Sequence, residues 1–200
     1  MIKAIIFDIG GVVLTPGEFE LLREHYTKLL NIPQSKFRPI FRANWRLWRI
    51  NKINEDQFWD NIFTELGIQY DNRKLLKKIM RDFPSVDDEI VEILKKLKGE
   101  YKIYALTNHA KEWFEWEIKN YKLDELFDFI QTSYDSESAK PEEKIYLDLL
   151  KNSKLKPEEC IFFDDQEDNI EAAKKIGFHA FQFKEVDGLK QNLIKFNIQI

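Results

Sequence analysis

Asp8 is the first residue of the sequence whose position could support chemistry. It ends a nearly unbroken apolar run, Ile2 to Phe7, and is followed by Gly10 and Gly11. A short run of this kind predicts a central strand buried on both faces of a sheet. Open α/β sheets bind ligands at the carboxyl ends of such strands, and glycines expose backbone N–H groups to anions. A strand ending in a simple turn is the alternative on this stretch alone.

Two later strand ends also carry polar side chains. Thr107 and Asn108 follow a predicted strand and precede a helix, where a hydroxyl group and backbone N–H groups can form an anion site. Helix capping by either residue is the simpler explanation. Lys140 lies before Pro141, ahead of another helix. A single lysine in such a loop is usually solvated, so Lys140 is a candidate site residue only in combination with the other polar strand ends.

Asp164 and Asp165 form an acidic pair after a third apolar run. Two adjacent carboxylates at a sheet edge repel each other and lose hydration, so both stay ionised readily only beside a cation. Oxygen ligands of this kind suit Mg²⁺. Asn169, four residues after Asp165, would point toward the same pocket from the first turn of a helix. An acidic helix N-terminus favoured by the helix dipole is the alternative.

The elements that would bring these groups together alternate along most of the chain. Helical patterns cover residues 87–98, 110–119, 142–151, 167–176 and 188–196, and strand patterns cover 101–106, 127–132, 159–163 and 179–183. This alternation predicts an α/β fold with a parallel sheet and helices on both faces. In such a sheet the polar strand ends converge on one edge.

Residues 16–84 differ from the rest, because they contain helical patterns and no strand. The patterns cover about 18–30, 39–50, 54–66 and 72–81. Asn54 and Gln57 have the spacing of a capping box, and Gly67 is a natural C-terminal cap. We therefore predict a core formed by residues 1–15 and 85–200, with a four-helix lobe of residues 16–84 inserted after the first strand.

The inserted lobe contains a basic and aromatic stretch. Residues 36–52 include six basic side chains and no acidic one. Arg42, Trp45 and Arg46 could attract an anion and stack on a ring, and His109 is a further candidate contact. A solvated arginine face with aromatic residues packed inside the lobe is the alternative.

Composition and charge argue against some classes of function. The 200 residues carry a net charge of −4 and are 44% hydrophobic, which predicts a folded domain and argues against a general nucleic-acid or membrane-surface binder. Cys160 is the only cysteine and lies in an apolar run, so it forms no internal disulfide. No stretch has transmembrane length or the pattern of a signal peptide. We expect a soluble cytoplasmic protein, monomeric or weakly dimeric.

Together these residues resemble the motifs of the haloacid dehalogenase (HAD) superfamily, in its phosphatase branch. The stretch 7–12 resembles the first motif, with Asp8 in the place of the nucleophile. Residues 106–108 resemble the second, in which Thr107 holds the transferred phosphoryl group, and Asn108 adjoins it. Lys140 resembles the third motif, and residues 163–169 resemble the fourth, whose acidic pair holds Mg²⁺.

The resemblance implies a fold, a cofactor and a reaction. The fold would be a three-layer Rossmann-like sheet in the order 5-4-1-2-3, with a helical cap after the first strand. Asp8, the backbone carbonyl of Gly10, Asp164 and Asp165 would bind Mg²⁺, and Gly11 would contact the substrate. The reaction would be hydrolysis of a small phosphate monoester, such as a sugar phosphate, through an aspartyl-phosphate on Asp8.

Gly10 departs from the family pattern. Phosphatases of the superfamily usually have a second aspartate there, which transfers a proton to the leaving group. Glu18 or Glu20 could replace it from the cap hinge, although each is also explained as a solvated helix residue. Without this acid the chain could be a slow or leaving-group-selective phosphatase. Two alternatives remain: a 2-haloacid dehalogenase, which the acidic pair disfavours, and a non-catalytic protein that binds a phosphoryl ligand or a partner.

Overall fold

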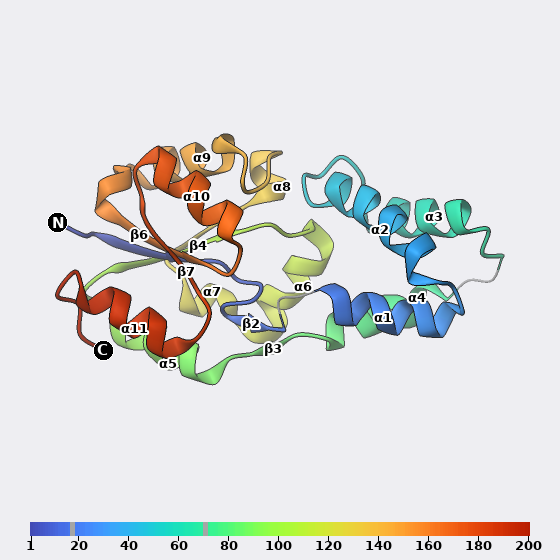
Figure 1. Ribbon diagram of the computed structural model, residues 1–200, viewed down its shortest axis with the longest axis horizontal. Helices are drawn as coiled ribbons and strands as arrows, with labels where there is room; N and C mark the ends of the chain where they lie inside the picture. The colour runs from blue at the N-terminus through green and yellow to red at the C-terminus, as the bar shows by residue number, and fades with distance from the viewer. Residues whose placement is uncertain (17–18, 70–71) are drawn as a thin grey trace.

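The computed structural model describes residues 1–16, 19–69 and 72–200 (Figure 1). The strands are β1 (Ala4–Phe7), β2 (Leu14–Thr15), β3 (Ser85–Val86), β4 (Lys102–Thr107), β5 (Phe129–Thr132), β6 (Cys160–Asp164) and β7 (His179–Gln182). The helices are α1 (Phe19–Leu30), α2 (Gln34–Trp48), α3 (Glu55–Leu66), α4 (Arg73–Asp82), α5 (Asp88–Leu97), α6 (Lys111–Tyr121), α7 (Leu123–Leu126), α8 (Ser133–Ser136), α9 (Glu143–Ser153), the 3-10 helix η1 (Pro157–Glu159), α10 (Glu167–Ile176) and α11 (Val186–Ile194).

Five parallel strands form the central sheet in the order β5-β4-β1-β6-β7. Numbered along the chain, these strands lie in the order 3-2-1-4-5, which is the predicted 5-4-1-2-3 seen from the other edge. The predicted α/β fold is therefore confirmed. Because β1 is central and all five strands are parallel, the carboxyl ends of β1, β4 and β6 lie next to one another.

Helices cover both faces of the sheet, as Figure 1 shows, with α9 and α10 on one side and α5 and α11 on the other. Alternate side chains of β1 face opposite layers. Ile5 and Phe7 pack in the cluster with α5 and α11, whereas Ala4 and Ile6 pack in the cluster with α9 and α10. All four are fully buried, as expected for a strand covered on both faces.

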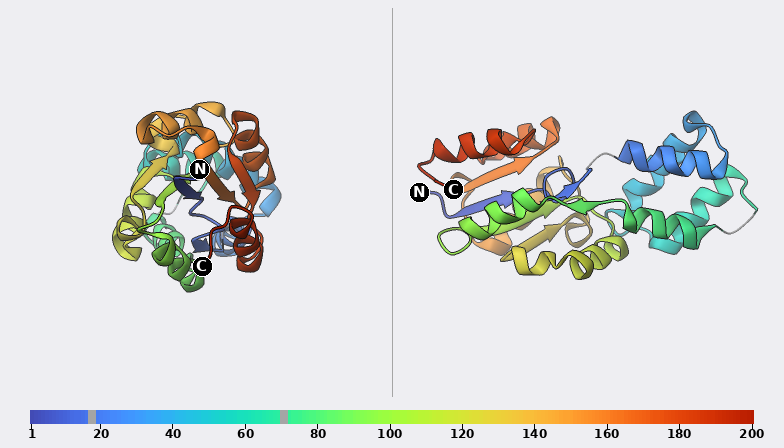
Figure 2. Two further views of the ribbon diagram at one scale, coloured as in Figure 1. Left: turned by 90° about the vertical axis from the view of Figure 1, so that its left-hand side faces the viewer. Right: turned by 90° about the horizontal axis from the view of Figure 1, so that it is seen from below.

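A helical lobe, formed by α1 to α4, extends from the end of the sheet (Figures 1 and 2). It has a hydrophobic core of its own, in which Trp48 and Trp59 are the largest of the almost completely buried side chains. This core also includes Ala110 and Trp113, which come from the start of α6 in the sheet-containing part. The lobe is therefore packed against α6, and Trp48 Nε1 donates a hydrogen bond of 2.8 Å to Glu112 there.

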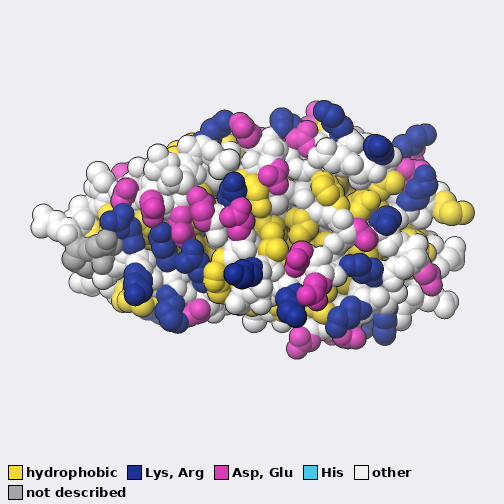
Figure 3. Space-filling model, turned by 180° about the vertical axis from the view of Figure 1, so that it is seen from behind, with side chains coloured by type: hydrophobic (Ala, Val, Ile, Leu, Met, Phe, Trp, Pro, Cys, Tyr) yellow, Lys and Arg dark blue, Asp and Glu magenta, His cyan; other side chains and the backbone are white. Residues whose placement is uncertain are grey.

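Both connections to the helical lobe pass through a small antiparallel ladder. Leu14 pairs with Val86 and Thr15 pairs with Ser85, so β2 and β3 lie side by side just beyond β1. Neither two-residue strand has a sequence pattern of its own, and the sequence did not predict them. On the face shown in Figure 3, acidic and basic side chains are interspersed over the surface of the molecule. Among the described residues, no helix has the length and apolar character needed to cross a membrane.

The predicted start of the second helix is wrong. α2 begins at Gln34, five residues before the expected start, and Pro39 lies inside it. Burial explains the difference: Phe37 is fully buried and Phe41 nearly so in the core of the lobe, so packing stabilises the first turns despite the proline. The capping box of Asn54 is present as predicted.

Candidate active site

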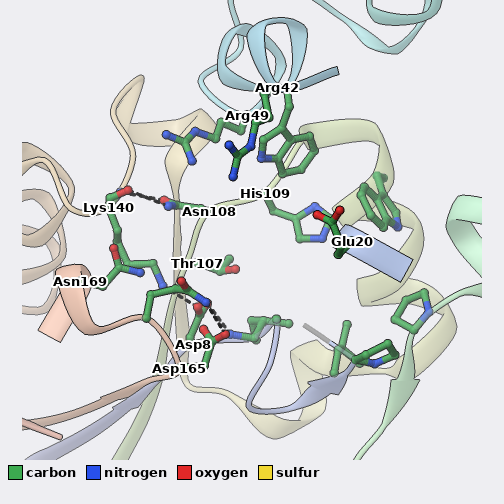
Figure 4. A pocket seen from close by; sticks show the side chains of 18 of the residues that line it. Asp8, Glu20, Arg42, Arg49, Thr107, Asn108, His109, Lys140, Asp165 and Asn169 are labelled. Atoms are coloured by element: carbon green, nitrogen blue, oxygen red, sulfur yellow. Dashed lines mark hydrogen bonds and ion pairs between the residues drawn. The ribbon is translucent and has the colours of Figure 1, made fainter. Parts of the chain in front are cut away.

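A cavity of about 730 Å³ lies between the carboxyl edge of the sheet and the helical lobe. The sheet-containing part contributes Asp8, Gly10, Thr107, Asn108, His109, Lys140, Asp165 and Asn169 to its lining. The helical lobe contributes Glu20, Arg23, Arg38, Phe41, Arg42, Trp45 and Arg49. Figure 4 shows side chains from the two parts facing each other across it. The structure thus brings the polar strand ends together.

Lys140 is at the centre of this arrangement, and its side chain is fully buried. Its Nζ donates hydrogen bonds to the backbone oxygen of Leu106 at 2.7 Å and to Asp164 Oδ2 at 2.6 Å, and lies 2.9 Å from Asp8 Oδ2. These three contacts use all the protons of the ammonium group. Burial alone would lower the pKa of Lys140, but Asp164 and Asp8 raise it, so the group stays charged.

Asn108 fixes the backbone of Lys140. Its Nδ2 donates to the carbonyl oxygen of Lys140 at 2.9 Å, and its Oδ1 accepts from the N–H of Lys140 at 2.8 Å. Both ends of the amide are therefore engaged, so Asn108 acts here by positioning the lysine. Its neighbour Thr107 ends β4, is 1% exposed and lines the cavity.

Three carboxylates meet beside Lys140: one oxygen each from Asp8, Asp164 and Asp165 lies within 4.8 Å of the others. Besides its bond from the lysine, Asp164 accepts hydrogen bonds from the N–H of Gln166 at 2.8 Å and from Asn169 Nδ2 at 2.9 and 3.1 Å. Protein donors thus occupy both oxygens of this fully buried carboxylate. Asp8 also accepts a hydrogen bond from the N–H of Ile9, at 2.7 Å, but Asp8 and Asp165 line the cavity, whereas Asp164 does not.

The electrostatic environment of Asp8 favours a cation. Burial raises the pKa of Asp8 to about 7, Lys140 opposes this shift, and Asp164 and Asp165 add to it. Burial likewise raises the pKa of Asp165. One ammonium group does not neutralise three carboxylates, and hard oxygen ligands in excess suit Mg²⁺. The residues therefore fit this ion, which Asp8 and Asp165 would hold, with Gly10 lining the cavity beside them.

Gly11 lies outside the residues that line the cavity, although we expected it to contact the substrate. Its φ is +81°, and a Cβ atom there would lie 2.8 Å from Cγ and Oδ2 of Asp165. Such a distance is a steric clash. The structure therefore shows a packing role for Gly11: it lets the loop after β1 approach the side chain of Asp165.

Arg42 and Trp45 line the cavity as expected, whereas Arg46 is exposed and lies outside the lining. Helix geometry explains the difference. Each step of four residues turns the next side chain about 40° further around the helix axis. Arg46, two such steps after Arg38, therefore points away from the cavity. The three-residue step to Arg49 turns back by about 60°, and Arg49 lines the cavity. Its seven-residue spacing from Arg42 was the signal for it in the sequence.

No replacement for a proton donor at position 10 emerges among the cavity residues that the structure describes. A hydrogen bond from Arg23 lowers the pKa of Glu20, so this glutamate is ionised at neutral pH. Both ring nitrogens of His109 face protein acceptors: Nε2 lies 3.0 Å from Glu117, and Nδ1 lies 3.2 Å from the carbonyl oxygen of Ala110. Glu117, on α6, has no sequence signal of its own. The other candidate, at position 18, lies outside the described residues.

Comparison with known proteins identifies the family. A family model described as a haloacid dehalogenase-like hydrolase matches residues 2–177. The chain belongs to the haloacid dehalogenase-like hydrolases. It is 24% identical over 189 residues to D-ribitol-5-phosphate phosphatase of Bacteroides thetaiotaomicron, which covers 91% of this chain and 92% of that protein. It is also 24% identical over 189 residues to a phosphorylated carbohydrates phosphatase of Thermotoga maritima, covering 88% and 82%.

A solved structure shares the fold of this HAD-like hydrolase. A HAD family enzyme from Bacteroides thetaiotaomicron, in complex with magnesium and inorganic phosphate, aligns with a TM-score of 0.77 and 24% identity. The alignment covers 92% of this chain and 95% of that chain. The predicted family is confirmed, and magnesium is found in a structure of this fold.

We expect Gly11→Ala to destabilise the protein, because alanine at a positive φ costs about 1–3 kcal/mol and its Cβ would meet Asp165. Urea unfolding measures the effect. Gly10→Ala is the matched control: a Cβ there meets nothing within 4 Å, and we expect a change within about 1 kcal/mol. Equal losses in both variants would contradict the packing role of Gly11.

The raised pKa of Asp8 predicts how stability and Mg²⁺ binding depend on pH. Folded Asp8 titrates at about 7, and unfolded aspartate at about 4. Between these values the folded state binds more protons, so without metal this residue makes the free energy of unfolding fall as pH rises. Mg²⁺ requires the ionised carboxylate. Its addition should therefore raise Tm more at about pH 8 than at about pH 5.5.

Asp8→Asn is the control for this measurement. It removes the titrating group, so the contribution of position 8 to the pH dependence of stability should disappear, and most of the Mg²⁺-dependent rise in Tm with it. A rise in Tm that is the same at both pH values, or unchanged in the variant, would show that Mg²⁺ does not bind at Asp8.

Proposed function

We propose that this HAD-like hydrolase cleaves small phosphate monoesters, with Asp8 as the nucleophile and Mg²⁺ as the cofactor. The observation that carries the proposal is the contact of buried Lys140 with Asp8, at 2.9 Å, beside Asp165 at the end of an open cavity. This arrangement places a carboxylate oxygen where an electrophilic phosphorus could approach, next to a fixed positive charge. Both relatives described above are named as phosphatases, which supports the same class of reaction.

Asp8 would form a bond from its carboxylate oxygen to phosphorus while the bond from phosphorus to the ester oxygen breaks. Water would then attack the phosphorus of the aspartyl-phosphate, releasing inorganic phosphate and regenerating the carboxylate. Lys140 would balance the charge that Asp8 and the phosphoryl oxygens share, and Thr107 would donate a hydrogen bond to a phosphoryl oxygen. A Mg²⁺ ion held by Asp8 and Asp165 would supply further positive charge to these oxygens.

We further propose that residues 16–84 act as the cap of this active site. The cap hypothesis rests on the shared cavity and on contacts between the two parts. Ser133 Oγ donates to the carbonyl oxygen of Arg49 at 2.6 Å, and Lys52 Nζ lies 2.6 Å from Glu137. A lobe held over the nucleophile in this way would exclude water during phosphoryl transfer and select the substrate.

Gly10 makes the leaving group decisive. Glycine has no ionisable side chain that could donate a proton to the leaving oxygen, and the described neighbours do not supply such a group. An alcohol leaving group would have to take its proton from water, whereas an aryl or acyl oxygen can depart unprotonated. Loss of a general acid costs about a hundred- to ten-thousand-fold in rate, so we infer a phosphatase that turns over alkyl phosphates slowly.

The primary test is release of inorganic phosphate from an aryl phosphate and a panel of sugar phosphates, with and without Mg²⁺. We expect activity that depends on Mg²⁺ and falls at least about a thousand-fold in Asp8→Asn, because the nucleophile is lost. Asp124→Asn, an exposed aspartate on α7, is the matched control and should retain full activity. Full activity of Asp8→Asn, or of the enzyme in excess chelator, would refute the proposal.

Gly10→Asp tests the missing proton donor. A Cβ atom at position 10 meets nothing within 4 Å, so the added carboxyl group has room. We expect kcat for a sugar phosphate to rise by about a hundred-fold or more, and kcat for an aryl phosphate to change far less. Gly10→Ala separates the acid from the added volume. An equal effect on both substrates would show that proton donation at this position does not limit the rate.

A further inference from the structure

The charged side chains of the cavity are mostly paired. The pairs are Glu20 with Arg23 and Arg38, Glu117 with His109, and Lys140 with Asp8 and Asp164. Arg42 of α2 and Arg49, the C-terminal cap residue of that helix, are exceptions. Among the residues that the structure describes, neither has a carboxylate oxygen within 4.0 Å.

The backbone of Arg49 is still helical, and seven residues make about two helical turns, so both arginines lie on the same side of the helix. Figure 4 shows their side chains directed from α2 toward the cavity, on the side of Asn108 and His109. The Nε atoms of two cavity arginines, Arg49 and Arg23, are buried without a hydrogen-bond partner among the described residues, and of these two only Arg49 also lacks an ion pair there. Burial lowers the pKa of Arg49, and the more distant Glu142 only partly opposes this. A buried donor without an acceptor is costly, and an anion bound in the cavity beside Arg49 would supply one.

We propose that Arg42 and Arg49 bind a second anionic group of the substrate, a phosphate or a carboxylate, while the phosphoryl group to be cleaved lies at Asp8. This inference rests on the proposed function and names its substrate class: phosphate monoesters that carry another anion. Guanidinium groups bind both anions with paired hydrogen bonds. Trp45 lies between the two arginines along α2 and lines the cavity, so it offers an apolar surface to the carbon skeleton that joins the anions.

The opposite ends of the cavity then have complementary roles. At the sheet end, Asp8 and Asp165 carry the negative charge that requires a metal ion, and the phosphoryl group would approach that ion. At the helical-lobe end, Arg42 and Arg49 carry positive charge that no carboxylate of the described residues pairs within 4.0 Å. A substrate with one anionic group can interact with the charged groups at only one end of the cavity, whereas a substrate with two can interact with those at both ends.

Binding to the inactive Asp8→Asn protein tests the inference without turnover, and the comparison within each pair of ligands does not depend on how much Mg²⁺ this variant still binds. Isothermal titration calorimetry compares fructose 1,6-bisphosphate with fructose 6-phosphate, and 3-phosphoglycerate with glycerol 3-phosphate. The first pair tests a second phosphate and the second pair a carboxylate. We expect the doubly anionic member of at least one pair to bind about ten- to a hundred-fold more tightly, because charged hydrogen bonds are gained.

Variants of α2 locate the effect. Arg42→Gln and Arg49→Gln, each added to Asp8→Asn, should remove most of this preference. Arg46→Gln, the exposed neighbour outside the cavity lining, should preserve it. Arg42 is itself exposed, so its substitution tests the site even if Arg49→Gln fails to fold. Equal binding within both pairs, or a preference that survives Arg42→Gln, would overturn the inference.

Different results would contradict the phosphatase proposal and the proposal of a second anion site. Phosphate release from singly anionic esters with no preference for doubly anionic ones would leave the phosphatase proposal intact and remove the second anion site. Preferential binding that depends on the arginines, with no turnover of any ester, would leave the anion site intact and remove the phosphatase proposal.

Discussion

The ammonium group of Lys140 makes the buried edge of the sheet possible. Three carboxylates meet there, and charges removed from water are tolerated only when they are paired and hydrogen-bonded. Its contacts join the ends of β4, β1 and β6, because they reach Leu106, Asp8 and Asp164. The lysine therefore needs these strands to be adjacent and in register, and the parallel order of the sheet provides this arrangement.

Asp164 and Asp165 are adjacent at the end of β6 but have different surroundings and different roles. Asp164 faces inward, is fully buried and is saturated by donors from the protein. Asp165 lies half-buried at the cavity, where the loop of Gly11 packs against it. One carboxylate thus maintains the framework, and the next remains available to a ligand. Asp164 is the last residue of β6, so its side chain is held in the sheet, whereas Asp165 lies just beyond the strand and reaches the cavity.

The sequence predicted those parts of the site that depend on topology. Apolar runs that end in polar residues indicate parallel strands, and parallel strands place Asp8, Thr107 and Asp164 on one edge whatever the details of packing. The sequence did not show which side of the second helix faces the cavity, because that depends on contacts between distant segments. Arg49, rather than Arg46, faces the cavity because the helical lobe is packed on α6 and α8 in one particular way, through contacts such as that of Ser133 with the backbone of Arg49.

The origin of the cavity walls has an evolutionary consequence. The groups proposed to perform the reaction come from the sheet edge, whereas the arginines proposed to recognise the distal anion come from α2 and its C-terminal cap residue, within an inserted segment. Substitutions along that single helix can alter which metabolite is accepted while the reacting groups stay in place. Descendants of such a chain can therefore diversify in selectivity without rebuilding their chemistry.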